Sequence, residues 1–259
     1  LDAMASGGLY DHVGGGFHRY CVDREWTVPH FEKMLYDNAE ITRAFLAGYQ
    51  LIGRERYAEV ARETFEFVER ELTHSEGGFY STLDAESADS TGSREEGAFY
   101  VWTPKAVRDA VDDGTAADLF CERYGVTEEG NFENNTTVLT ESTPASELAA
   151  DSVMGTDAVE ELIDEATEEL FEARETRSRP PRDEKVLAAW NGLMISAYAE
   201  GSLVLDSSYV DRAEDALSFC GEHLWDAEDR RLYRRFERGE VGIPGYLEDY
   251  AFLGRGAFD

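Results

Sequence analysis

Residues 7–38 gather side chains that can do chemistry. Imidazole groups exchange protons near neutral pH, guanidinium groups bind anions through paired hydrogen bonds, and aromatic rings offer stacking surfaces. The five glycines at positions 7, 8, 14, 15 and 16 exclude a continuous helix and predict a shaped loop. A loop that presents such groups is typical of a functional site. Its chemically capable residues are His12, His18, Arg19, Tyr20, Asp23, Arg24, Trp26 and His30.

The histidines of this segment do not have the spacing of a metal site. Zinc ligands usually occur in short pairs, whereas His12, His18 and His30 are widely spaced. We therefore expect no bound metal and no other cofactor. The alternative for each histidine is a hydrogen-bonded structural residue in a loop that only reverses the chain.

The residues after the loop predict a helix over 27–52, with a proline near its start. On that helix His30, Lys33 and Asp37 share one face, because steps of three and four residues return to the same side. Lys33 can then pair with Asp37. If this face lines a cavity, His30 can exchange a proton while Asp37 orients it or acts as a second acid or base.

Helical periodicity returns along the chain as a repeat. Residues 56–72 complete a hairpin with 27–52, and residues 186–205 and 209–224 form a second hairpin whose apolar positions share one offset with the first. A third copy begins at Gly245. Repeated hairpins predict an all-α solenoid or closed helical toroid. Other expected elements are helices from Thr103-Pro104, near 116–123 and over about 157–177, and short strands or turns at 78–80 and 231–233.

A polar residue stands near the start of the first helix of each copy: Asp37, Asn191 and Asp249. In a toroid these helix starts would surround the central cavity. Core packing does not require a carboxylate there, because a buried unpaired charge costs several kcal/mol. The alternative is the ordinary preference of helix N-termini for Asp and Asn.

The composition is strongly acidic. Fifty-five Asp and Glu against 24 Lys and Arg give a formal net charge of −31, and the lysines are only Lys33, Lys105 and Lys185. The acidic residues are spread along the chain, which predicts a solvated surface suited to concentrated salt, where screening removes most self-repulsion. A halophilic cytoplasm is the first interpretation, and a basic partner is its rival. Nucleic acid binding is disfavoured, because no basic stripe is present to neutralise phosphates.

The spacing of the cysteines and the hydropathy of the sequence indicate the cellular compartment. Cys21, Cys121 and Cys220 are odd in number and include no close pair, which argues against disulfides and thiol redox chemistry. No apolar run has membrane-spanning length, and no cleavable signal opens the sequence. We expect a cytoplasmic protein without membrane contact, and a sequence that is a piece of a longer chain.

Six segments in order resemble the YyaL-type family, the spermatogenesis-associated proteins with an N-terminal thioredoxin-like domain and a C-terminal (α/α)6 toroid. The longest segment, residues 7–37, includes GGLYDHVGGGFHRY and VPHFEKMLYD. The other five lie within residues 77–81, 96–103, 124–132, 185–194 and 247–253.

The resemblance implies an (α/α)6 toroid, similar to N-acylglucosamine 2-epimerases and six-hairpin glycosidases, but no particular reaction. Residues 1–259 would be part of one toroid domain with short β-turn or hairpin insertions in its loops, lacking the thioredoxin-like domain and the last hairpins. The sequence departs from the family at Leu83, where a carboxylate is usual, and at Glu86, where Asp is usual. This weakens a cation-binding role for the loop, and solvated surface acid is the alternative for Asp84 and Glu86.

Aromatic residues in the shared loops favour a neutral sugar as ligand. Sugar C–H faces stack on aromatic rings, while amides and carboxylates hold the hydroxyls. Phosphate is disfavoured by the scarcity of cations, and the alternative for each ring is that it fills a gap between hairpins. The candidate substrate-binding residues are Arg19, Tyr20, Trp26, Lys33, Tyr36, Asp84, Glu86, Trp102, Trp190, Asn191, Tyr246 and Glu248.

Three functions remain open. The first is an enzyme acting on a carbohydrate or polyol, by epimerase-like or isomerase-like proton transfer or by glycosidase-like cleavage. Its acid/base candidates are His18, His30, Asp37 and Asp249. The second is a non-catalytic sugar or peptide binding module, and the third is a helical scaffold for the thioredoxin-like domain.

Overall fold

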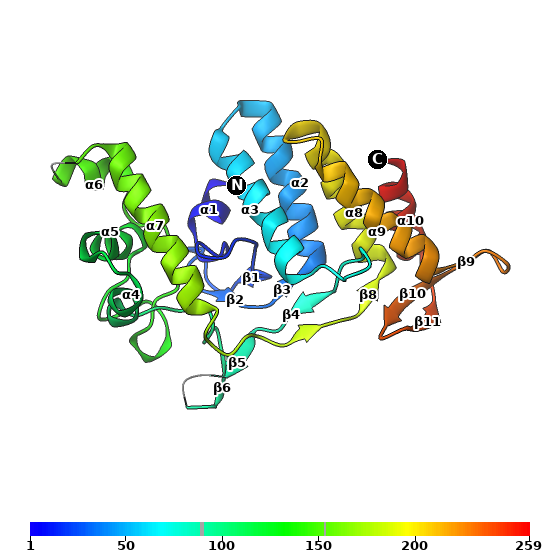
Figure 1. The fold of residues 1–259 in the computed structure, drawn as a ribbon, viewed down its shortest axis with the longest axis horizontal. Coiled ribbons are helices and arrows are strands. Elements are labelled where there is room, and N and C mark those ends of the chain that lie inside the picture. The colour runs from blue at the N-terminus through cyan, green and yellow to red at the C-terminus, as the bar shows by residue number, and fades with distance from the viewer. Residues whose placement is uncertain (89–90, 153) are drawn as a thin grey trace.

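Two helical hairpins form the centre of the computed structural model, which describes residues 1–88, 91–152 and 154–259 (Figure 1). The first pairs α2 (Leu35–Ile52) with α3 (Glu55–Glu71), and the second pairs α8 (Ala188–Val204) with α9 (Tyr209–His223). Helix α8 packs against α2 on one side and α10 (Leu247–Phe258) on the other, so α2, α8 and α10 form one row. The prediction of a mostly helical fold of repeated hairpins is confirmed.

The remaining helices lie between the two hairpins in sequence, apart from the short N-terminal α1 (Asp2–Ser6). The predicted helices at 103, 116–123 and 157–177 are confirmed as α4, α5 and α7, and Thr103 caps α4 by accepting a hydrogen bond from the Ala106 N–H. The helices between the two hairpins occupy one end of the molecule in Figure 1. They are α4 (Pro104–Ala110), α5 (Gly114–Tyr124), the 3-10 turn η1 (Glu133–Asn135), α6 (Ala145–Asp151) and α7 (Thr156–Arg174).

Short strands form the predicted insertions, and two of them lead directly into helices of the row. β3 (Lys33–Met34) precedes α2 and pairs with β4 (Thr82–Leu83), which also pairs with β7 (Arg182–Asp183). In the equivalent place, β8 (Val186–Leu187) precedes α8 and pairs with β10. The other strands are β1 (Tyr20–Cys21), β2 (Pro29–His30), β5 (Glu86–Ala88), β6 (Arg94–Glu96), β9 (Trp225–Asp226), β10 (Arg231–Glu237) and β11 (Glu240–Pro244).

The prediction that the first long helix begins at residues 27–29 is wrong. That helix begins at Leu35, and the residues before it are extended: His30 pairs with Tyr20, and Lys33 pairs with Leu83. Asp23 holds the preceding turn by accepting the N–H groups of Thr27 and Val28. Proline suits an extended strand as well as a helix start, so it could not distinguish the two. His30, Lys33 and Asp37 therefore do not share a helix face.

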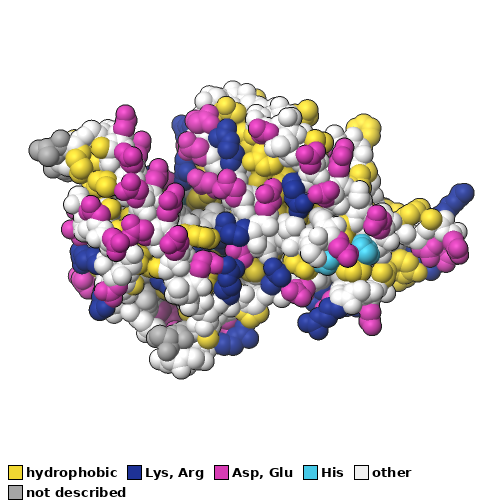
Figure 2. Space-filling model, viewed as in Figure 1, with side chains coloured by type: hydrophobic (Ala, Val, Ile, Leu, Met, Phe, Trp, Pro, Cys, Tyr) yellow, Lys and Arg dark blue, Asp and Glu magenta, His cyan; other side chains and the backbone are white. Residues whose placement is uncertain are grey.

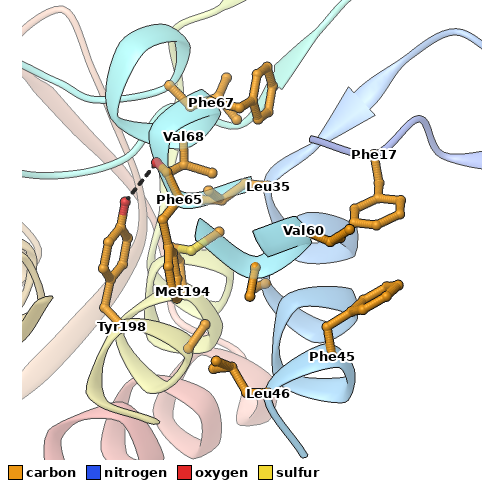
Figure 3. Packing of buried hydrophobic residues seen from close by; sticks show 14 of the residues in the cluster. Phe17, Leu35, Phe45, Leu46, Val60, Phe65, Phe67, Val68, Met194 and Tyr198 are labelled. Carbon is orange, nitrogen blue, oxygen red and sulfur yellow. Dashed lines mark hydrogen bonds between the residues drawn. The ribbon is translucent and has the colours of Figure 1, made fainter. Parts of the chain in front are cut away.

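The main core lies between the two hairpins (Figure 3). Phe65 of α3 stacks on Tyr198 of α8, with ring centroids 4.4 Å apart, and the Tyr198 hydroxyl donates to the Phe65 carbonyl at 3.3 Å. Phe17 of the Gly-rich loop stacks on Phe45 of α2. The inserted helices have a separate apolar cluster that includes Phe120 of α5. The glycine-rich loop is thereby part of the main core.

Two asparagines hold the hairpins to the preceding chain in the same way. The Asn38 amide accepts from the Phe17 N–H at 2.7 Å and donates to the Phe17 carbonyl at 3.0 Å. The Asn191 amide does the same for Phe79, at 2.8 and 3.0 Å. Each asparagine is fully buried in the first turn of its helix. The predicted match between Asp37 and Asn191 in the repeat is therefore wrong by one residue, because Asn38 is the counterpart of Asn191. Asn191 is fully buried and has no surface left for a ligand.

Asp249 also has a structural place. It is fully buried, and its Oδ1 accepts from the Ala189 N–H of α8 at 3.1 Å. Its Oδ2 accepts from the Tyr246 N–H at 2.9 Å and from Arg234 at 3.1 Å. One carboxylate thus caps α10 and ties it to α8. The expectation that Asp249 faces a cavity as an acid/base is corrected.

Acidic side chains are spread over the visible surface, with Lys and Arg between them (Figure 2). Across the residues that the structure describes, no helix is both long enough and apolar enough to cross a membrane.

The two asparagine contacts can be tested by removal. Asn38→Ala or Asn191→Ala leaves a buried N–H and C=O without partners, and each such group costs about 1–3 kcal/mol. We expect each variant to lose about 3 kcal/mol of unfolding free energy by urea denaturation in concentrated salt. Gln50→Ala, at an exposed position of α2, is the control and should change stability by less than about 0.5 kcal/mol. Equal stability of Asn38→Ala and the control would contradict this role.

Candidate functional site

A buried ionic group anchors the glycine-rich loop. Asp11, Lys33 and Arg174 form it, and we call it the Asp11 triad: Lys33 Nζ donates to Asp11 Oδ2 at 2.7 Å, and Arg174 Nη1 donates to Asp11 Oδ1 at 2.8 Å. All three side chains are at most 5% exposed. A Cβ on Gly14 would collide with the Arg174 guanidinium, so a larger residue there would displace Arg174 from Asp11. The predicted Lys33–Asp37 pair is wrong, because Lys33 precedes the helix and is buried against Asp11.

Burial and charge set the protonation of the Asp11 triad. Burial lowers the pKa of Lys33 to about 8, although Asp11 opposes this shift. Burial alone would raise the pKa of Asp11, but Arg174 and Lys33 hold it well below its usual range. The triad is therefore an ion pair shared by two cations.

Two of the predicted histidines are buried as well. His18 packs its ring edge-on against Tyr100, with centroids 4.7 Å apart, and its Nδ1 lies 3.0 Å from the Phe31 carbonyl. Burial lowers its pKa to about 3. His12, which lies 3.0 Å from the Gly7 carbonyl, has its pKa lowered by burial to about 4. His18 is thus a neutral core residue, and the expectation that it exchanges protons near neutral pH is corrected.

Five other residues form a partly exposed polar group, which we call the Asp37 cluster: Arg19, His30, Glu32, Tyr36 and Asp37. Arg19 connects it, because Nη1 donates to Glu32 at 2.9 Å and Nε donates to the Tyr36 hydroxyl at 3.2 Å. His30 Nε2 lies 3.2 Å from the same Glu32 oxygen. The extended segment 29–34 and the first turn of α2 position these residues.

Asp37 is the chemically most distinctive member of the cluster. Its Oδ2 atom is buried and has no hydrogen-bond partner among the residues that the structure describes. Burial raises the pKa of Asp37 to about 6, while Arg19 opposes the shift. A carboxyl group with this pKa exchanges a proton close to neutral pH, as a general acid or base must.

His30 lies between two carboxylates. Its Nδ1 is 2.6 Å from Glu96 Oε1, and its Nε2 faces Glu32. Both ring nitrogens therefore face a carboxylate oxygen. Glu96 also accepts the Phe31 N–H at 3.2 Å and so fixes the strand. Glu32 and Glu96 were missed as site residues, although both stand in segments that carry the family resemblance.

Aromatic rings flank the cluster. Tyr36 and Trp190, in the first turns of α2 and α8, have ring centroids 4.8 Å apart, and both are partly buried. Tyr20 stacks on His30 at 5.2 Å and is 51% exposed. The structure thus brings together six of the predicted site residues: Arg19, Tyr20, His30, Tyr36, Asp37 and Trp190.

The other predicted binding residues lie elsewhere. Trp102 is buried under Arg177, whose guanidinium lies 3.8 Å from the ring centroid. Asp84 and Glu86 pair with Arg94 beside the β5–β6 hairpin. Glu248 pairs with Arg234, which also lies over the Tyr246 ring, while Trp26 is exposed with its carbonyl bonded to Gly8. Within the described ranges no three His, Cys, Asp or Glu residues are grouped to hold a metal.

Comparison with known proteins gives one group of relatives and a set of weak structural likenesses. No family model matches the chain. It is 41% identical to spermatogenesis-associated protein 20 of Homo sapiens and 38% identical to that of Mus musculus, in both cases over 100% of this chain. The chain spans 36% of the length of each of these relatives.

The solved structures that are similar are more distant. A sugar epimerase from a ruminal bacterium is 14% identical, with a TM-score of 0.30 over 96% of this chain and 61% of that chain. An unsaturated glucuronyl hydrolase specific for heparin is 12% identical, with a TM-score of 0.27 over 96% of this chain and 65% of that chain.

The burial of the Asp11 triad predicts that removing Asp11 costs much more unfolding free energy than removing an exposed carboxylate. Asp11→Ala leaves Lys33 and Arg174 buried without a counter-charge, and we expect it to lose about 3–5 kcal/mol of unfolding free energy. Asp84→Ala removes an exposed pair with Arg94 and should cost less than about 1 kcal/mol. Urea denaturation of both variants measures the difference. Similar losses would contradict the anchoring role of Asp11.

Asp37 predicts a pH-dependent stability. Its folded pKa of about 6 lies above the ordinary value of 3.8, so the stability that its proton contributes is complete below pH 3.8 and is lost as the pH rises through 6. Asp37→Asn should therefore be more stable than the wild type above pH 6, by about 1 kcal/mol after allowance for partial solvent screening. The gain should shrink towards pH 4. Urea denaturation at pH 4.5 and 7.5 measures it, and a gain independent of pH would contradict the raised pKa.

Proposed function

The chain belongs to the spermatogenesis-associated protein 20 family, and we propose that its Asp37 cluster binds a neutral sugar or polyol and transfers a proton to or from it. The buried, unpartnered Oδ2 of Asp37 is the observation that carries this proposal. An unpaired polar atom in a folded protein is costly unless a ligand or water meets it. A substrate hydroxyl or C–H would supply that missing contact.

Asp37 and His30 divide the acid and base roles. Asp37, with a pKa of about 6, removes a proton in its ionised form above that pH. His30, whose two ring nitrogens face Glu32 and Glu96, is the partner that returns a proton. Two acid/base groups in one cluster suit epimerisation or isomerisation, where one proton leaves and another returns.

Glycoside cleavage is less well supported. That reaction needs two available carboxyl groups on either side of the bond. Asp249, the expected second carboxylate, is fully buried, and both of its oxygens accept hydrogen bonds from α8, α10 and Arg234. Glu32, the other carboxylate of the Asp37 cluster, is paired with Arg19 and His30, so proton transfer at one carbon is the better proposal.

The surroundings of Asp37 supply the binding surfaces. Tyr36 and Trp190 present partly exposed rings beside it, against which the apolar face of a sugar can stack. Arg19 and Glu32 offer a donor and an acceptor for hydroxyl groups. One charge of each sign fits a neutral polyol better than a phosphate.

Ligand binding and turnover can be separated in one experiment. Neutral monosaccharides, disaccharides and polyols are screened by thermal shift in concentrated salt, and ligands that bind are followed by NMR for isomerisation. We expect at least one sugar to raise the melting temperature of the wild type and of Asp37→Asn. Turnover should fall by about 10²-fold or more in Asp37→Asn, because the acid/base group is gone.

Asp84→Asn is the matched control, since it removes an exposed carboxylate outside the cluster, and its turnover should equal that of the wild type. Binding without conversion in the wild type would instead indicate a non-catalytic binding module. Conversion that survives in Asp37→Asn would remove Asp37 from the chemistry.

A further inference from the structure

A second polar site lies beneath the glycine-rich loop, apart from the Asp37 cluster. It is a narrow cavity of about 20 Å³, enough for one water-sized sphere. Asp11 and Lys33 line it together with Tyr100 and Arg174. Arg70, Arg179 and Glu71 lie nearer the surface, where they are partly exposed or pair with one another.

The cavity contains hydrogen-bond donors that lack acceptors. The Tyr100 hydroxyl and Arg174 Nε are both buried and have no partner in the part of the chain that the structure describes. Lys33 Nζ carries three hydrogens and meets two acceptors, Asp11 and the Gly15 carbonyl. Burial raises the pKa of Tyr100, and the charges that act on it are those of Asp11, Arg174, Glu71 and Arg179, so its hydroxyl faces this charged group.

The acceptors around the cavity are already engaged. Asp11 Oδ1 accepts from the Val13 and Gly14 N–H groups and from Arg174, and Oδ2 accepts from Lys33 and Arg174. The two oxygens of Glu71 accept from Arg70 and Arg179, at 3.0 and 2.6 Å. Glu175, the third carboxylate of the lining, pairs with Arg179.

The side chains that line the cavity also carry a net positive charge. Four cations, Lys33, Arg70, Arg174 and Arg179, face three carboxylates, Asp11, Glu71 and Glu175, which leaves one positive charge. The whole chain carries −31, so this is a local reversal. A single monovalent anion would neutralise the site.

We propose that this cavity binds one chloride ion, held by the Tyr100 hydroxyl, Arg174 Nε and the third hydrogen of Lys33. Chloride accepts several hydrogen bonds and donates none, as a site with surplus donors requires. A water molecule brings two hydrogens that would themselves need acceptors.

A bound chloride would connect three parts of the fold. Its ligands come from β3, from the turn after Gly97 and from the last turn of α7. Lys33 directly follows Glu32 of the Asp37 cluster, so the ion would also stiffen the extended segment 29–34 that includes His30 and Glu32. The site is nevertheless independent of any sugar chemistry.

Bromide replaces chloride and scatters anomalously, so it gives a direct test. Crystals of the protein grown in sodium bromide should show an anomalous peak in the cavity between Tyr100 and Arg174. A cavity that holds only ordered water, or an anomalous signal confined to the surface, would overturn the proposal.

Thermal unfolding supplies an independent test with a matched control. Melting temperatures are compared in sodium chloride and sodium gluconate at equal concentration, for the wild type, Tyr100→Phe and Tyr198→Phe. Tyr198 is another buried tyrosine, whose hydroxyl bonds the Phe65 carbonyl. General salt effects act on all three proteins, so the informative quantity is the difference between them.

A ligand that binds only the folded state stabilises it in proportion to the logarithm of its concentration above the dissociation constant. The chloride-specific rise in melting temperature should therefore be present in the wild type and Tyr198→Phe and be reduced or lost in Tyr100→Phe. An equal chloride effect in all three proteins would count against the site.

Discussion

The buried charge of Asp11 is the interaction on which the rest of the structure depends. A carboxylate in the interior is tolerated only when several donors surround it. Asp11 meets this need with two backbone N–H groups of its own loop and with Lys33 and Arg174, which stand far apart in the sequence. The glycine-rich loop, the strand before α2 and the end of α7 are thereby held at one point.

The Asp11 triad also determines where the residues of the Asp37 cluster lie. Lys33 is drawn inward to Asp11, and the extended residues around it turn Glu32 and His30 outward, beside Arg19 and Asp37. The same burial that fixes His18 as a neutral core residue leaves Asp37 half-buried with a raised pKa. The extended segment 29–34 thus contributes Lys33 to the Asp11 triad and contributes His30 and Glu32 to the Asp37 cluster.

Buried polar side chains also join the repeated hairpins to each other. Asn38 and Asn191 each give a core phenylalanine backbone the two hydrogen bonds that a neighbouring strand would supply. Asp249 then joins the third helix of the row to the second through the Ala189 N–H. Polar side chains at the helix starts therefore connect successive hairpins, and the residue beside Asn38, Asp37, has an oxygen without a partner among the described residues.

The sequence alone was sufficient for the helices and their repetition, because apolar spacing is a local property that long amphipathic helices such as α3 and α9 display fully. It also identified the family and named six residues, Asp37 among them, that the structure brings together. It could not show that residues 29–34 are extended, because that conformation depends on pairing with Tyr20 and Leu83. Neither pairing leaves a local sequence pattern that identifies it. Nor could it separate Asp37 from Asn38, or His18 from His30, because burial and hydrogen-bond partners arise only when remote segments pack together. Tertiary structure therefore decided which of these polar residues became part of the core and which remained partly exposed.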